Sequence, residues 1–181
     1  MNKSKIRDKI LKIRKKKFDK NIRINSDKFI SLLRINRLNL KNVGGYYPSN
    51  YEIDDLELLV LLKKKNFKVS LPIIKKNNQM NFYNWSINDP LKINKFGIPE
   101  PLGSKIIYPD ILLVPLVAYD GHLNRLGYGG GYYDRYIEKL EKIKKVIKIG
   151  LAFSFQKISS IPINQYDKRL DFIFTEKEIL K

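Results

Sequence analysis

One segment, running from 111 to 136, constrains the fold of this chain more than any other. It begins with a continuous apolar run at 111–118, passes through a glycine-rich stretch and continues into a helix-like sequence. The stretch has four glycines in five positions, Gly127, Gly129, Gly130 and Gly131. Without Cβ atoms, consecutive backbone N–H groups can converge on an anion, and a following helix adds its positive N-terminal end there. The segment therefore predicts a buried strand, a phosphate-binding loop and a helix.

The glycine cluster by itself leaves two interpretations open, because a tight turn between a strand and a helix needs glycine as well. The flanking residues favour a phosphate site. Arg125 supplies a guanidinium fork for phosphate, and Asp134 supplies a hard oxygen ligand for Mg²⁺. The loop matches neither a Walker A motif, since no Gly-Lys-Ser/Thr follows, nor the spacing of a dinucleotide motif. Together these residues suit a nucleoside triphosphate.

The remainder of the chain alternates helix-like and strand-like segments. We expect helices at 4–17, from 26 through 37 until Gly44 and Gly45 stop it, from 56 and at 132–145. We expect strands at 68–74, 80–85, 111–118 and 146–153, a short strand leading to 46–48, and a long loop at 91–109. Ser26 is the expected N-cap of the second helix, which would carry Arg37, and Asp54 or Asp55 that of the third.

This alternation predicts an α/β protein with three αβα layers, a Rossmann-like fold whose mostly parallel sheet carries helices on both faces. No repeat or linker interrupts residues 1–181, so we expect a single domain. In such folds ligands lie beyond the carboxyl ends of the strands, where Tyr47, Glu52 and the glycine loop would share one site.

Composition excludes several kinds of site. The chain has no cysteine and one histidine, so disulfides, thiolate metal sites and cysteine nucleophiles are excluded and little is left for zinc. The apolar runs fall far short of the roughly 20 residues of a membrane span, and no signal segment follows Met1, so we expect a cytoplasmic protein without membrane contact.

The formal charge of +18 would ordinarily suggest nucleic acid. Lysine is spread along the whole chain, however, and no nucleic-acid-binding motif accompanies it. We therefore expect no specific binding of nucleic acid.

Ordered motifs run along almost the whole chain and together point to a family. They are Lys3 to Arg7, Tyr47 through Glu52 and Asp54, Leu71-Pro72, Met80-x-Phe82, 96–101, 115–120, the glycine loop, 149–152 with Gln156, and 167–176. In these motifs the chain resembles the 5-formyltetrahydrofolate cyclo-ligases, also called 5,10-methenyltetrahydrofolate synthetases, which carry a closely similar Arg-Leu-Gly-x-Gly-x-Gly-Tyr-Tyr-Asp signature. The resemblance implies conversion of 5-formyltetrahydrofolate and ATP to 5,10-methenyltetrahydrofolate, ADP and phosphate. Such a reaction depends mainly on positioning and charge neutralisation, so no nucleophilic side chain is required.

The resemblance also implies roles for individual residues. Glu52 would pair with the pterin donors, Tyr47 and Tyr133 would line the folate pocket, and Asp134 with Asp167 would hold Mg²⁺. Arg125 and Tyr133 are the expected catalytic residues. The triphosphate of ATP would contact Lys3, Arg7, Arg125, Leu126, Gly127, Tyr128, Gly129, Gly130, Gly131, Tyr132 and Tyr133.

Spacing alone gives plainer interpretations for several of these side chains. Lys3 and Arg7 read as a solvated basic face, and Glu52 and Asp134 fit the first turn of a helix as well as they fit a ligand site. Asp167 reads as a loop residue. The aromatic residues Phe82, Trp85, Phe96 and Tyr133 would suit a flat ring, although aromatics commonly serve the core.

Two positions depart from the family pattern. Leu123 stands where many relatives have glycine, and Tyr166 where many have histidine beside Asp167. His122 reads as an exposed turn residue.

Two other functions are alternatives to the family activity. One is a sugar-phosphate-type enzyme of related layered fold, which Lys3, Arg7 and Asp134 disfavour, and the other is a basic nucleic-acid-binding module. We expect a monomer acting on small molecules.

Overall fold

The computed structural model describes residues 2–35, 40–103 and 105–181. Its helices are α1 (Lys3–Lys17), α2 (Ser26–Ile35), α3 (Leu56–Lys64) and α4 (Tyr132–Glu141), with a 3₁₀ turn at Ser154–Gln156. The strands of the main sheet are β1 (Asn42–Gly44), β2 (Lys68–Ile74), β3 (Met80–Asn84), β6 (Ile106–Ile107), β7 (Ile111–Pro115), β10 (Ile147–Leu151), β11 (Phe172–Phe174) and β12 (Ile179–Leu180). Two hairpins stand apart from it: β4 (Leu91–Ile93) with β5 (Pro99–Pro101), and β8 (Ala118–Tyr119) with β9 (Arg125–Leu126).

The main sheet has the order β12-β11-β10-β7-β1-β2-β3-β6. The five strands from β11 to β2 are parallel, and the pairings of β12, β3 and β6 at the two edges are antiparallel. In the centre, β10 pairs with β7 from Ile147 opposite Ile111 to Leu151 opposite Pro115. The expected mostly parallel sheet is confirmed.

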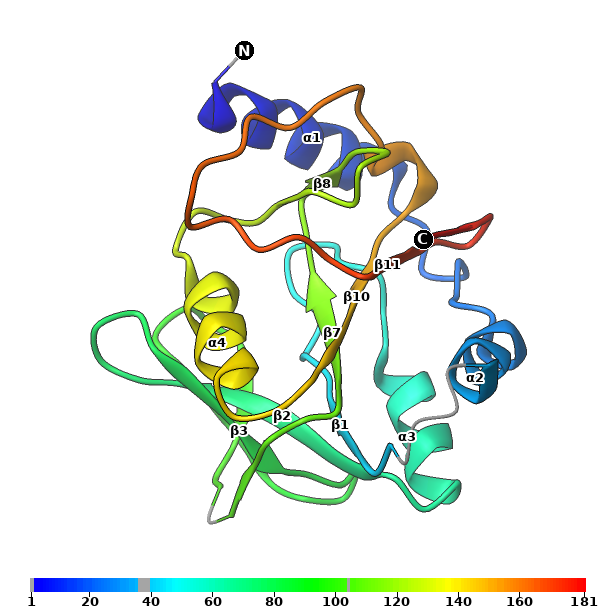
Figure 1. Ribbon diagram of the computed structural model, residues 1–181, viewed down its shortest axis with the longest axis vertical. Helices are drawn as coiled ribbons and strands as arrows, with labels where there is room; N and C mark the ends of the chain where they lie inside the picture. The colour runs from blue at the N-terminus through cyan, green and yellow to red at the C-terminus, as the bar shows by residue number, and fades with distance from the viewer. Residues whose placement is uncertain (1, 36–39, 104) are drawn as a thin grey trace.

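Alternating side chains of β7 show how the layers form. Ile111 and Leu113 belong to the core shared with α2 and α3, whereas Leu112 and Val114 belong to the core shared with α4. Successive side chains of a strand point to opposite faces, so a strand apolar at every position must be covered on both. Figure 1 shows α2 and α3 on one side of the sheet and α4 on the other, which confirms the three-layer αβα prediction.

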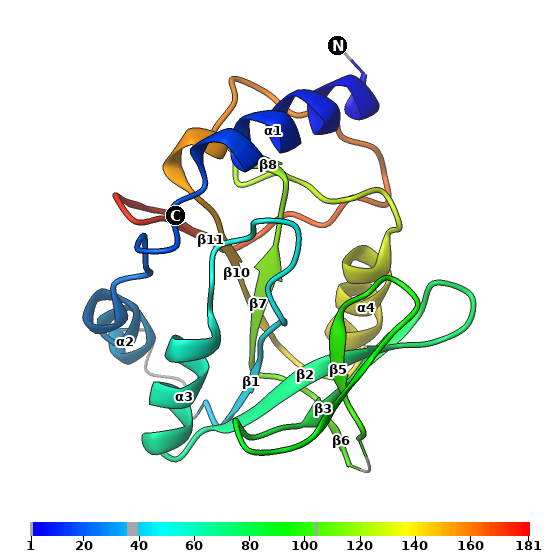
Figure 2. The same ribbon diagram turned by 180° about the vertical axis from the view of Figure 1, so that it is seen from behind.

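Helix α1 belongs to neither layer. Its buried Ile6 and Ile10 pack on Val117, Ala118 and Leu126 of the β8–β9 region. In both views α1 therefore crosses the end of the molecule to which β7 points, beyond the carboxyl ends of the parallel strands (Figures 1 and 2). This position brings the start of the chain to the edge where ligands of such folds bind.

The structure differs from the expected elements at several ends. The predicted loop at 91–109 contains β4, β5 and β6, and the predicted strand at 111–118 ends at Pro115 before a separate hairpin begins. The expected helix at 132–145 ends at Glu141. Arg37 lies outside the described residues.

The cap of α2 shifts by one residue, because Asn25, rather than Ser26, accepts the N–H of Lys28. At α3 the N-cap is Asp55, one of the two expected residues, but its side chain makes no cap hydrogen bond, and the carboxylate of Asp54 accepts the N–H of Leu56 at 2.8 Å. These side chains satisfy helix N–H groups that have no partner within the helix.

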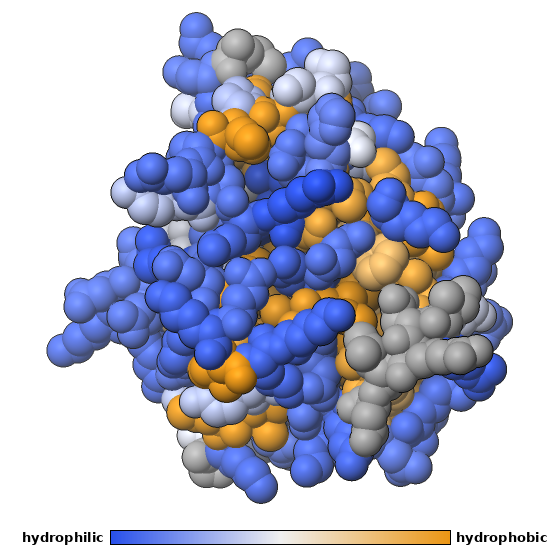
Figure 3. Space-filling model, viewed as in Figure 1, coloured by the Kyte–Doolittle hydropathy of each residue, from blue (hydrophilic) through white to orange (hydrophobic). Residues whose placement is uncertain are grey.

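The surface seen in Figure 3 is mostly hydrophilic, with apolar patches between the polar side chains. Within the described ranges, no helix has both the length and the apolar character that a bilayer span requires.

The turn that follows β8 is stabilised by a buried carboxylate, Asp120. It accepts the backbone N–H groups of His122, Asn124 and Ile161 and the side-chain amide of Asn124, at 2.9–3.1 Å. Burial alone would raise the pKa of Asp120, but the hydrogen bonds from Asn124, Ile161 and His122 outweigh it and hold the pKa below its ordinary value.

Asp120→Asn should therefore destabilise the fold at pH 7 by about 1.5–3 kcal/mol, the range for hydrogen bonds to a charged group. Because the folded-state pKa is depressed, the stabilisation by the carboxylate is present above about pH 4 and is lost as the pH falls through the folded-state pKa. Denaturant unfolding of both proteins at pH 7 and pH 3 checks this. A stability difference that stays constant with pH would show that the charge is not its cause.

Candidate functional site

A cavity of about 1450 Å³ lies beside the glycine loop. Its lining comes from α1, the loop after β1, the ends of β2 and β3, the tip of the β4–β5 hairpin, the glycine loop and the turn around 164–167. Single ligand pockets are typically about 300–1,000 Å³, so this volume has room for two substrates. Every residue assigned to the site from the sequence lines it: Lys3, Arg7, Tyr47, Glu52, Arg125, Leu126, Gly127, Tyr128, Gly129, Gly130, Gly131, Tyr132, Tyr133, Asp134 and Asp167.

The glycines of the loop serve different needs. Gly129 and Gly131 have φ values of +101° and +67°, and Gly131 is the N-cap of α4, so these two need glycine for their backbone conformation. A Cβ at Gly127, in contrast, would meet no atom within 4 Å. Protein packing therefore does not explain Gly127, whereas the close approach of a ligand to its backbone would. This favours the phosphate loop over the purely structural turn.

Two arginine side chains of helix α1 contact the glycine loop, residues 127–131. Arg7 donates from Nε to the carbonyl oxygen of Gly127 at 2.7 Å, and Arg14, two turns further along, donates to the hydroxyl of Tyr128. Residues 3, 7 and 14 follow helical spacing, so the same side of α1 presents all three cations. Lys3 and Arg7 thus lie on the cavity wall rather than on a solvated face.

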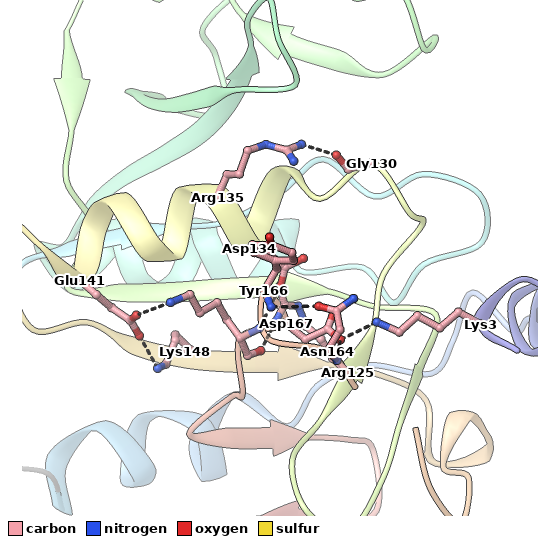
Figure 4. A network of polar contacts seen from close by, with 11 residues as sticks. Lys3, Arg125, Gly130, Asp134, Arg135, Glu141, Lys148, Asn164, Tyr166 and Asp167 are labelled. Carbon is pink, nitrogen blue, oxygen red and sulfur yellow. Dashed lines mark hydrogen bonds and ion pairs between the residues drawn. The ribbon is translucent and has the colours of Figure 1, made fainter. Parts of the chain in front are cut away.

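Two carboxylates of the site are already paired with cations, as Figure 4 shows. Asp134 binds Nη2 of Arg125 at 2.6 Å and accepts the N–H of Lys168 at 3.1 Å. Asp167 binds Nζ of Lys3 at 2.5 Å. Asp167 adjoins Lys168, whose backbone N–H donates to Asp134, so the fold brings the two residues to the same part of the cavity wall although a helix and a strand separate them in sequence.

Asp134 and Asp167 suit a Mg²⁺ site, because they supply carboxylate oxygens and are accessible from the cavity. Both carboxylates supply hard oxygens, line the cavity and keep about a quarter of their side-chain surface exposed, 27% for Asp134 and 24% for Asp167. Among the described residues, no group of three or more His, Cys, Asp or Glu side chains could hold a metal. A Mg²⁺ bound here would therefore take its other ligands from water and phosphate oxygens, as this ion commonly does.

Glu52 forms a buried carboxylate on the same cavity wall, with 7% of its surface exposed. Its Oε2 accepts the N–H of Ser49 at 2.8 Å and the Ser49 hydroxyl at 3.3 Å. Burial raises the pKa of Glu52, and the hydrogen bonds from Ser49 and Tyr128 together with the charge of Arg14 partly offset that rise. The group can accept hydrogen bonds from a ligand with amino and amide donors.

The hydroxyl of Tyr133 is buried and has no hydrogen-bond partner within the described part of the chain. Burial first, and then the charges of Glu52 and Asp55, raise its pKa well above the ordinary value, so it stays protonated. A buried donor without a partner is costly, and a ligand in the adjoining cavity would satisfy it.

The structure also locates the other aromatic residues, the two residues that differ from the family pattern, and the histidine. Phe96 lines the cavity and meets Tyr132 edge to face with ring centroids 6.1 Å apart, whereas Trp85 is in the core, 2% exposed. Leu123 has a φ of +65°, a left-handed conformation that favours glycine, and its side chain is buried beside α4. Tyr166 lines the cavity and is 70% exposed. His122 is exposed in its turn and does not line the cavity.

The sequence interpretation missed two residues that contact side chains of the site. Ser49 donates a hydrogen bond to Glu52, and Arg14 donates one to Tyr128. A signal for Arg14 existed, because it lies seven residues after Arg7 on the face that also carries Ile10, where a cation is unusual. Ser49 has no such signal.

Comparison with known proteins agrees with these motifs. Residues 1–176 match the model of the 5-formyltetrahydrofolate cyclo-ligase family. The 5-formyltetrahydrofolate cyclo-ligase of Haemophilus influenzae is 36% identical over 134 residues, 70% of this chain and 71% of the relative. That of Escherichia coli is 30% identical over 144 residues, covering 76% and 79%.

Solved structures agree as well. The 5,10-methenyltetrahydrofolate synthetase of Aquifex aeolicus superposes with a TM-score of 0.76 at 33% identity, covering 100% of this chain and 93% of the other. The enzyme of that name from Mycoplasma pneumoniae gives a TM-score of 0.72 at 26% identity, covering 97% and 99%.

Proposed function

Because the chain belongs to the 5-formyltetrahydrofolate cyclo-ligase family, we propose that it converts 5-formyltetrahydrofolate and ATP to 5,10-methenyltetrahydrofolate, ADP and phosphate. One observation carries the proposal: the glycine loop and a buried carboxylate, Glu52, line the same cavity. The loop suits a triphosphate and the carboxylate suits the donor edge of a pterin, so one cavity can bring the two substrates together.

The chemistry follows from that juxtaposition. The formyl oxygen attacks the γ-phosphorus and ADP leaves. N10 then attacks the activated formyl carbon and gives up its proton, and the carbon–oxygen bond breaks as the phosphate departs with that proton, as hydrogen phosphate. Negative charge develops on the phosphoryl oxygens in the first step, where Lys3, Arg7 and Arg125 supply positive charge and the loop supplies N–H groups. Glu52 and Tyr133 orient the folate.

The direct experiment mixes the protein, Mg-ATP and 5-formyltetrahydrofolate and follows the near-ultraviolet absorbance of the methenyl product. ADP should form only when the folate is present, since the formyl oxygen is the proposed acceptor. Absence of the product, or rapid ADP release without folate, would overturn the proposal. A sugar-phosphate-type enzyme would show neither ATP use nor product, and a nucleic-acid-binding module would bind oligonucleotides at physiological salt instead of being stabilised by Mg-ATP.

We further propose that Asp134 and Asp167 hold the Mg²⁺ that accompanies ATP. Asp134→Asn and Asp167→Asn should each raise the Mg²⁺ concentration for half-maximal activity and leave metal-free folate binding nearly unchanged. Magnesium titrations and folate binding in chelator check both. The control is Asp171→Asn, an exposed carboxylate that pairs with Lys148 away from the cavity.

An unchanged Mg²⁺ requirement in both variants would contradict the assignment. Asp134→Asn also removes the ion pair with Arg125, so its melting temperature must be measured alongside. A monomeric state, a cytoplasmic location and the absence of specific nucleic-acid binding stay predictions.

A further inference from the structure

Arg135 is a cavity-lining cation that belongs neither to the family signature nor to the proposed chemistry. It stands near the start of α4, and its Nη2 donates to the carbonyl oxygen of Gly130, a contact drawn as a dashed line in Figure 4. Its Nε donates to the carbonyl oxygen of Asn78 at 3.1 Å. The side chain therefore joins the glycine loop to the turn between β2 and β3.

The turn between β2 and β3 gives Arg135 a fixed anchor. Asn77 and Asn78 both have left-handed backbones, with φ values of +56° and +53°. Two such residues in succession are typical of the tight two-residue turn of a β-hairpin. The hydroxyl of Tyr132 also donates to Oδ1 of Asn78, at 3.2 Å. The start of α4 thus binds this turn at two points.

The bond to Gly130 fixes the direction of a whole peptide group. In a trans peptide the carbonyl and the following N–H point in opposite directions, so a carbonyl that faces Arg135 turns the N–H of Gly131 the other way. That N–H has no backbone acceptor among the residues that the structure describes. At the other end of the loop, Arg7 fixes the carbonyl of Gly127 and thereby the N–H that follows it. Free N–H groups of this kind attract phosphate.

The two guanidinium groups also lie where side chains of the loop would otherwise extend. A Cβ at Gly131 would stand 2.8 Å from Nη1 of Arg135, and a Cβ at Gly129 would stand 3.4 Å from Cζ of Arg7. Each arginine therefore lies against one glycine and bonds the carbonyl oxygen of another. The loop is held in the same manner twice, once from α1 and once from α4.

We infer that Arg135 is a positioning residue for ATP: it holds the Gly130 carbonyl turned away from the phosphates and so presents the Gly131 N–H to them, without contacting the nucleotide itself. This inference rests on the proposed function, because the loop must bind the triphosphate. The exposure of Arg135 is no obstacle, since only the direction of one peptide group has to be set, and the bond to Asn78 keeps the guanidinium in place.

Arg135→Met tests this, because methionine keeps an unbranched stem and has no donor. The KM for ATP should rise by about three- to tenfold, the effect of an ordinary hydrogen bond, while the KM for 5-formyltetrahydrofolate stays within about twofold. The matched control is Arg34→Met, an exposed arginine of α2 outside the cavity, which should leave both constants unchanged. Equal rises in both constants, or no rise for ATP, would overturn the inference.

The mobility of the loop separates positioning from a direct contact with phosphate. Backbone order parameters of Gly130 and Gly131, measured by NMR before any nucleotide is added, should fall in Arg135→Met and stay unchanged in Arg34→Met. A raised KM for ATP with unchanged order parameters would show that Arg135 contacts the phosphate itself, which overturns the inference.

Arg135→Lys gives a second readout. Lysine keeps the charge, but its single nitrogen cannot reproduce the two bonds from Nε and Nη2, so the KM for ATP should stay raised. Full recovery of ATP affinity would show that the charge alone matters and would overturn the inference. The lysine variant decides alone if the methionine variant does not fold.

Failure of this inference is distinguishable from failure of the proposed function. Wild-type protein that forms no methenyl product overturns the function and with it the inference. Wild-type protein that forms product, combined with an Arg135→Met variant whose ATP dependence or loop mobility is unchanged, overturns the inference alone.

Discussion

Arg125→Ala is expected to lower kcat/KM for ATP by about ten- to a hundredfold. The guanidinium lies on the cavity wall next to the glycine loop, and charge-assisted contacts to phosphate contribute roughly 1.5–3 kcal/mol. The side chain is only 4% exposed and binds the carbonyl of Lys168 and the carboxylate of Asp134. Its loss therefore also leaves Asp134 without its cation, and the melting temperature should fall with the activity.

Two further variants separate these effects. Arg125→Lys keeps the charge but loses the planar fork, so it should recover part of the ATP affinity and less of the stability. Arg23→Ala, which removes an arginine whose ion pair with Glu57 is exposed, should change neither. Steady-state kinetics with varied ATP, together with thermal melts, measure both. A folded Arg125→Ala variant with normal ATP dependence would show that this residue does not contact the triphosphate.

Glu52→Gln should have the opposite selectivity. The glutamine oxygen can still accept the Ser49 N–H, so the loop after β1 keeps its shape, but the charge that would bind the pterin donors is lost. We expect the KM for 5-formyltetrahydrofolate to rise by about ten- to a hundredfold and the KM for ATP to change little. Kinetics with each substrate varied in turn check this, with Glu57→Gln on the exposed face of α3 as the matched control.

The pH dependence gives a second check. Burial raises the pKa of Glu52, so acidification protonates the group within a range where an exposed carboxylate would stay charged. The wild-type KM for the folate should then rise as the pH falls, because protonated Glu52 resembles glutamine, and the Glu52→Gln variant should lack that rise. Equal damage to both substrates would point instead to a distorted site.

Much of the fold could be predicted because its determinants are local. The apolar run of β7, the glycine loop and the first turn of α4 follow one another in sequence, and period and turn chemistry depend on near neighbours. The family motifs likewise named residues that all line one cavity. Order along the chain was therefore sufficient to predict the three layers, and the assignment of the cavity-lining residues to a site stays a prediction.

Tertiary contacts decided which side chains and strands pair over long sequence distances, because local sequence patterns carry no information about such pairs. Whether Lys3 is a solvated lysine or a partner of Asp167 depends on a contact across 164 positions, and the link from Arg14 to Tyr128 spans 114. The short strands within 91–109 form only because partners pair with them, and Leu123 keeps a left-handed backbone because its side chain is buried beside α4. Burial and charge pairing depend on which distant segments meet. The sequence alone therefore predicted which chemical groups a site here would use, and only the folded chain decided which of those groups neutralise one another.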